Sequence, residues 1–149
     1  MAAVTAPAAL SPQLPAKRSP AGRVDDVLAV TGDVRKPKRT GDAALFSPAD
    51  RRDTARVSPD AFAGLRDIAF VRDPVEARDL RGEEAPPHRI RAAMLTQRRI
   101  LLVTDAPEVA PPVSAERDRA KSAVLRRYFT AVAEERVRGR QVTVYARRP

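Results

Sequence analysis

The sequence predicts a small mixed fold of the α+β or α/β class behind an extended N-terminal arm. Three observations carry this prediction. Prolines recur through the first 42 residues, the apolar run Ile100–Val103 stands between charged residues, and a long proline-free stretch follows Pro112. The expected order is therefore an arm over residues 1–42, short helices and loops over 43–97, and a strand–long helix–strand module over 98–149.

The arm over residues 1–42 is basic and rich in proline. Each proline fixes φ and removes a backbone donor, so neither a long helix nor a central strand is expected there. The run RKPKR places four cations, Arg35, Lys36, Lys38 and Arg39, within five residues. These four are candidates for contact with phosphate or with a protein partner, and a chance basic tail is the alternative.

Two helix starts are expected in the middle segment, which carries balanced charge. Ser47–Pro48 and Ser58–Pro59 each combine an N-cap serine with a proline at the first helical position. Apolar residues at helical spacing after Pro59 extend the second helix to the proline at position 74. A further short helix is expected over residues 88–97.

Aspartate and arginine alternate along much of the middle segment. This pattern predicts a solvated surface crossed by salt bridges, and the alternative is a polar surface that docks on a similar neighbour. The adjacent acids Glu83 and Glu84 are expected in a solvated turn.

The C-terminal module is predicted to contain strand 98–104, helix 115–138 and strand 141–147. Ser114 is a suitable N-cap, and Gly139 is a suitable terminator for the helix. If the two strands were parallel neighbours in one sheet, the crossover would be right-handed. Two strands do not make a stable sheet, so a third must come from elsewhere in the chain or from a partner.

A helical projection of this module separates apolar from basic residues. Tyr128 and Phe129 fall on the apolar half, whereas Arg126 and Arg127 fall on the other half. The aromatic pair is therefore expected in the core and the arginine pair on the surface. The arginines of this region form the second set of candidate partner or phosphate contacts: Arg126, Arg127, Arg138, Arg140, Arg147 and Arg148.

The composition excludes several classes of site. The chain has no cysteine and a single histidine, His88, so disulfides and thiolate chemistry are excluded and a zinc site would be unusual. The six glycines form neither a dinucleotide-binding nor a phosphate-binding loop motif. No residue qualifies as catalytic, and the expectation is a protein that is not an enzyme, with no cofactor and no metal.

The net charge of +9 and the pI of about 11.1 favour anionic partners. Codon bias is an alternative source of the arginine. The first functional hypothesis is a structural protein that docks through its arm and basic C-terminal module onto a large assembly of the virion or ribonucleoprotein type. The second is an accessory protein that grips nucleic-acid phosphates through its C-terminal arginines.

No small-molecule substrate and no membrane span are expected under either hypothesis, because no segment approaches the length of a membrane helix. The N-terminus makes a poor signal peptide. The localisation is open, with a virion or the cytoplasm favoured, or the nucleus in a eukaryotic host.

Overall fold

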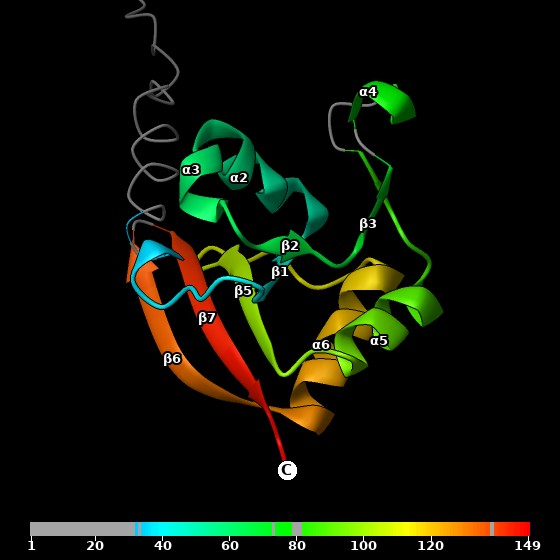
Figure 1. Cartoon of the computed structure of the whole chain (residues 1–149). Helices are drawn as coiled ribbons and strands as arrows, with labels where there is room; N and C mark the ends of the chain where they lie inside the picture. Colours follow the sequence, from blue (N-terminus) through cyan, green and yellow to red (C-terminus); the bar gives the residue numbers. More distant parts are fainter. Residues whose placement is uncertain (1–31, 33, 73, 79–81, 138) are drawn as a thin grey trace, which may run out of the picture.

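The structure, a computed structural model, describes residues 32, 34–72, 74–78, 82–137 and 139–149 (Figure 1). Most of the arm predicted over residues 1–42 lies outside these ranges. At the end of that segment, Val34 is buried and packs against the sheet, and the neighbouring Arg35 and Lys36 are exposed. The part of the arm that the structure describes therefore lies against the folded domain.

A five-stranded mixed sheet forms the centre of the fold, in the order β2-β1-β5-β7-β6. β1 pairs in parallel with β2 and β5, while β7 pairs antiparallel with β5 and β6. The strands are β1 (Ala43–Ser47), β2 (Arg66–Asp67), β5 (Arg99–Asp105), β6 (Phe129–Val137) and β7 (Arg140–Arg147). The strands that complete the sheet thus come from this chain.

Helices cover both faces of this sheet (Figure 1). One face carries the 3-10 helix η1 (Ala49–Arg52) and the short helices α2 (Asp53–Val57) and α3 (Pro59–Phe62). The other carries α5 (Pro87–Leu95) and α6 (Glu116–Tyr128). A small antiparallel pair, β3 (Phe70–Arg72) with β4 (Glu83–Glu84), stands beside the sheet with α4 (Pro74–Ala77) between its strands.

The alternation of side chains along β1 builds the two halves of the core. Ala43 and Leu45 pack towards α5 and α6, whereas Ala44 and Phe46 pack towards α2 and α3. All four are buried, as are the central residues of β5. A strand covered on both faces has apolar side chains at consecutive positions, because both of its faces are buried. Ile100–Val103 shows this pattern in the sequence.

Three predicted elements are confirmed with small shifts at their ends. The strands expected at 98–104 and 141–147 are β5 and β7, and the helix expected at 88–97 is α5. The expected order of strand, helix and strand in the C-terminal module is also present, with β6 added between α6 and β7.

The prediction of one helix over residues 115–138 is wrong beyond Tyr128. Phe129 adopts extended backbone, with φ of −128° and ψ of 160°, and begins β6. Gly139, at φ of +85°, lies in the turn between β6 and β7 and does not end a helix. β5 and β7 are neighbours but pair antiparallel. The right-handed crossover, which was expected only for parallel strands, therefore does not apply to them.

The two helices predicted from the serine–proline pairs also differ from expectation. Ser47 ends β1 and precedes a cis bond to Pro48, so it is not a helix N-cap. The second helix begins at Pro59 as expected but ends at Phe62. Gly64 has φ of +82°, a conformation that leaves the helix, and the apolar residues beyond it pack in the core from irregular chain and short strands.

Among the described residues, no helix combines the length and the apolar character needed to cross a bilayer.

Candidate functional site

Six arginines lie at the end of the domain where α5 and α6 finish, β6 starts and β7 stops. Four of them belong to the predicted set, and two lie in or just after α5. All six side chains are exposed. They are Arg91, Arg98, Arg126, Arg127, Arg147 and Arg148, and we call this group the basic end.

The ring of Tyr128 holds two of these arginines in place. The guanidinium carbon of Arg91 lies 5.6 Å from the ring centroid, and that of Arg127 lies 5.5 Å from it. Arg91 also donates a hydrogen bond of 3.1 Å to the Tyr128 hydroxyl. Cation–π contacts of this kind orient a guanidinium without neutralising its charge.

Backbone and hydroxyl oxygens orient two more. Arg148 donates to the Thr130 hydroxyl at 3.2 Å and to the Arg127 carbonyl at 3.3 Å. Arg147 donates to the carbonyl of Leu95, at the end of α5. Helix carbonyls at a C-terminus carry partial negative charge, which favours a cation there.

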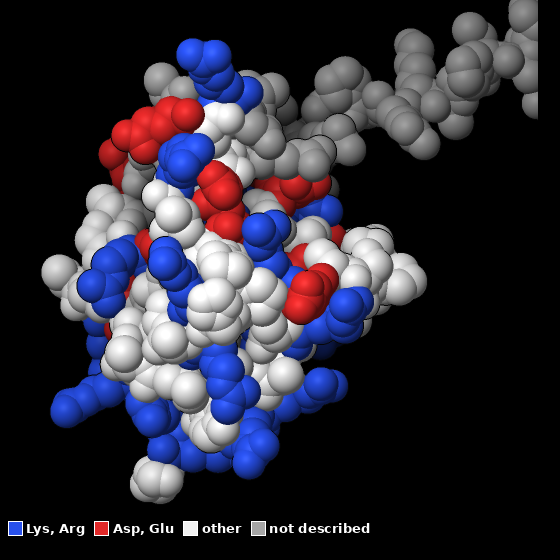
Figure 2. Space-filling view, turned by 90° about the vertical axis from the view of Figure 1, so that its right-hand side faces the viewer, with Lys and Arg blue, Asp and Glu red and all other residues white. Residues whose placement is uncertain are grey.

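No carboxylate in the part of the chain that the structure describes forms an ion pair with any of these six arginines. Figure 2 shows the same separation, with blue side chains gathered at the lower end of the molecule and red ones above it. The basic end therefore carries uncompensated positive charge.

The other predicted site residues lie elsewhere. Arg140, at the start of β7, is ion-paired with Asp105 at 3.1 Å and with Asp53 at 3.2 Å. Lys38 donates to three carbonyls at the end of α3, those of Asp60, Ala61 and Ala63. Arg35, Lys36 and Arg39 are exposed in the segment before β1, and Arg138 lies outside the described residues. The two predicted sets of cations are thus not assembled into one surface.

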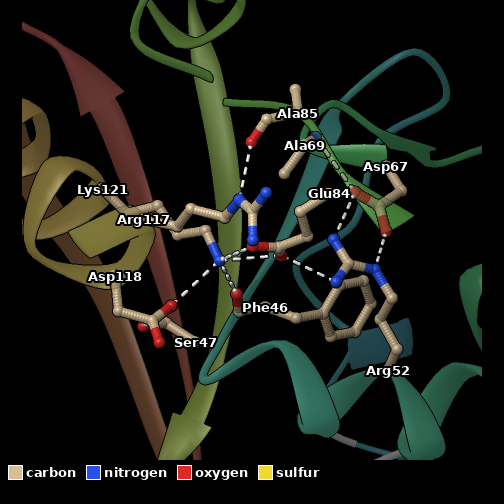
Figure 3. Close-up of polar contacts among 10 residues, drawn as sticks. All are labelled: Phe46, Ser47, Arg52, Asp67, Ala69, Glu84, Ala85, Arg117, Asp118 and Lys121. Carbon is tan, nitrogen blue, oxygen red and sulfur yellow. Dashed lines mark hydrogen bonds and ion pairs between the residues drawn. The ribbon is translucent and has the colours of Figure 1, made fainter. Parts of the chain in front are cut away.

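A second group of charges lies inside the domain, between α6 and the small β3–β4 pair (Figure 3). Lys121 of α6 is 0% exposed. Its ammonium nitrogen lies 2.8 Å from the carbonyl oxygen of Phe46, 2.8 and 2.9 Å from the two oxygens of Glu84, and 3.0 Å from Oδ1 of Asp118. These partners use all of its protons.

Glu84 links Lys121 to a buried arginine. Arg52 donates to Glu84 at 2.7 Å and makes two hydrogen bonds to Asp67, at 2.5 and 3.1 Å. Burial lowers the pKa of the Arg52 guanidinium, but Asp67 and Glu84 together outweigh burial and leave the pKa above its usual value. Arg52 therefore stays charged, and the two cations join three carboxylates into one chain of contacts. We call Arg52, Asp67, Glu84, Asp118 and Lys121 the buried cluster.

The buried cluster was not predicted from the sequence. Glu84 was expected in a solvated turn, which is wrong, because it is 7% exposed and paired with two cations, whereas Glu83 is exposed. One signal was present in the sequence: Lys121 precedes Val124, Leu125 and Tyr128 at the helical spacing of i+3, i+4 and i+7. A lysine on the apolar face of a helix indicates a buried, paired ammonium.

Known proteins offer no further guide: no family model, no curated protein and no solved structure matches this chain. The described residues contain no group of three or more histidine, cysteine, aspartate or glutamate side chains placed to hold a metal ion. His88 is exposed near the start of α5.

Proposed function

We propose that this protein binds the phosphate backbone of nucleic acid through its basic end. The single observation that supports this proposal most strongly is the convergence of six exposed arginines from different elements with no carboxylate partner among the described residues. A guanidinium presents paired N–H donors that match phosphate oxygens, and exposed arginines gain most from a polyanion when no carboxylate competes.

The contacts within the basic end favour backbone binding over base recognition. Arg91 and Arg127 already lie against the ring of Tyr128, so this aromatic side chain is engaged with cations. Phosphate contacts fix a protein on nucleic acid without carrying sequence information. We therefore expect binding that depends strongly on salt and weakly on sequence.

Replacing Arg126 and Arg127 together by alanine is expected to weaken binding to a labelled 20-base-pair DNA by about tenfold or more at low salt, because two phosphate contacts are lost. Fluorescence anisotropy measures this affinity. The matched control is the Arg56→Ala, Arg72→Ala double variant, which removes the same charge from two exposed arginines on α2 and β3. Equal losses in the two variants would show that net charge, and not the basic end, determines binding.

Docking onto a large assembly is a second proposal, favoured by the exposure of β6. β6 is an edge strand of the sheet, and residues 130–136 are exposed on both of its faces. Val132, at a bulge in the pairing with β7, is 56% exposed. An exposed edge of this length offers free backbone groups to a strand of a neighbouring subunit.

If the neighbouring subunit is a second copy of this chain, a charge on this edge is expected to prevent the docking. The variant Val132→Lys should remain monomeric at protein concentrations where the wild type associates, because an inserted lysine opposes edge-to-edge pairing. Light scattering after size exclusion measures the mass of each. Val57→Lys, at an exposed valine of α2, is the control and should associate like the wild type. A wild type that stays monomeric at millimolar concentration would contradict pairing between copies through β6.

A further inference from the structure

A cavity of about 500 Å³ opens beside the carboxyl ends of β1 and β5. Its walls come from these strand ends, from β7, from α6 and from the proline-rich connection between β5 and α6. The chain after β1 turns to the face covered by α2 and α3, whereas the chain after β5 leads to α6 on the opposite face. In open α/β sheets, ligands bind at the point where two such connections diverge.

The cavity combines an apolar body with a few polar groups. Its apolar walls include Leu102, Val113, Leu125 and the ring of Tyr145. Its volume is sufficient for a small organic molecule, and this mixture of apolar wall and sparse polar groups is typical of ligand sites.

One carboxylate oxygen in the wall of this cavity has no hydrogen-bond partner among the described residues. Oδ1 of Asp118 accepts from the Ser47 hydroxyl at 3.0 Å and from Lys121, while Oδ2 accepts no hydrogen bond from any described residue. A carboxylate oxygen without a partner favours a ligand that brings N–H donors.

The charges around the cavity favour a cation. Asp105, Asp118 and Lys121 are the charged residues in its wall, and the protons of Lys121 are already taken by Phe46, Glu84 and Asp118. Asp105 is neutralised from outside the wall by Arg51 and Arg140. Asp118 thus keeps one carboxylate oxygen without a hydrogen-bond donor among the described residues. It lies at the cavity end of the buried cluster, in which three carboxylates outnumber two cations.

Two neighbouring groups complete the charge environment. Arg117, one turn before Lys121, donates to the carbonyl of Ala85 (Figure 3). It is not among the residues that line the cavity. Burial raises the pKa of Tyr145, and the nearby Glu134 carboxylate raises it further. Glu134 is itself ion-paired with Arg136 at 2.8 Å, so it adds little net charge beside the cavity.

We propose that this cavity binds a small organic ammonium ion with an apolar body, with Asp118 as its counter-ion. The sequence-based expectation was of no small-molecule substrate, and a bound organic ammonium ion goes beyond that expectation. The proposal is independent of nucleic-acid binding at the basic end.

The test compares three probes that share an indole ring and differ in their head group: tryptamine, tryptophol and indole-3-acetate. Isothermal titration calorimetry on the full chain should give a dissociation constant for tryptamine at least about tenfold below those of the other two. Asp118→Asn, which keeps the shape of the side chain, should remove this preference. Ser122→Phe, which fills the cavity from α6, should abolish binding of tryptamine.

Circular dichroism first establishes that each variant is folded, and the comparison of the three probes on the wild type stands without any variant. Three results would overturn the proposal. The first is that tryptamine does not bind at about 5 mM, because any remaining affinity would be too weak for a specific site. The second is that indole-3-acetate binds more tightly than tryptamine. The third is that folded Ser122→Phe binds tryptamine as well as the wild type does.

Discussion

The variant Lys121→Met is expected to lose about 3–5 kcal/mol of unfolding free energy, since removing one partner of a buried ion pair leaves the other charge uncompensated. Lys121 is fully buried, and its ammonium satisfies Glu84, Asp118 and the Phe46 carbonyl together. Methionine fills similar space but donates to none of them. Such a loss is a large fraction of the stability of a domain of this size.

Urea unfolding followed by circular dichroism measures this loss. Arg126→Met is the matched control, because Arg126 lies on the same helix with an exposed side chain, and it should change stability by less than about 0.5 kcal/mol. Adding Glu84→Gln to Lys121→Met should recover part of the loss, since it removes one carboxylate of a cluster left with an excess of negative charge, while Arg52 keeps Asp67 as its partner. Equal stability of Lys121→Met and the wild type would refute the role given to the buried cluster.

The second large effect is expected at Phe129. Its side chain is 1% exposed and packs in the core between the sheet and helices α5 and α6, at the residue where α6 gives way to β6. Phe129→Ala should cost about 3–5 kcal/mol, because the ring leaves a cavity as well as losing its burial.

Val132→Ala serves as the control, since Val132 belongs to the same strand and is 56% exposed. It should change stability by less than about 0.5 kcal/mol. Thermal unfolding of the two variants side by side gives the comparison. If Phe129→Ala unfolded at the same temperature as the wild type while Val132→Ala unfolded at a much lower one, the assignment of the inward face at the start of β6 would be incorrect.

Local patterns in the sequence were enough to predict β5, β7 and α5. In each, the pattern of apolar residues matches the pattern of burial. Ile100–Val103, for example, is continuously apolar and belongs to a strand that is covered on both faces. β1 was missed because its run, Ala43–Phe46, contains two alanines and precedes a serine–proline pair that resembles a helix start. Only pairing with β2 and β5 makes this segment a strand.

The boundary between α6 and β6 shows why the rest was not predictable. The segment after Tyr128 contains residues compatible with a helix, and its strand conformation depends on pairing with β7 across the turn at Gly139. The separation of Phe129 from Arg126 and Arg127 was nevertheless predicted correctly, although the helix on which the projection was based ends at Tyr128. Tyr128, which was also expected in the core, is partly buried against it.

The residues of the candidate sites were likewise predicted only in part. Arg126, Arg127, Arg147 and Arg148 could be named from charge alone, but the sequence did not place Arg91 and Arg98 beside them. The buried cluster joins Arg52, Glu84 and Lys121 from three distant parts of the chain. Such contacts follow from the tertiary fold and have no local signature beyond a lysine on an apolar helix face.

The measurement that tests nucleic-acid binding most directly is the dependence of the DNA association constant on salt concentration. In a plot of the logarithm of this constant against the logarithm of salt concentration, the slope reports the number of phosphates neutralised. We expect Arg126→Ala with Arg127→Ala to flatten the slope by about 2 units, one for each lost contact, and Arg56→Ala with Arg72→Ala to leave it unchanged. A wild type with no measurable slope, or a slope that both double variants flatten equally, would contradict binding through the basic end.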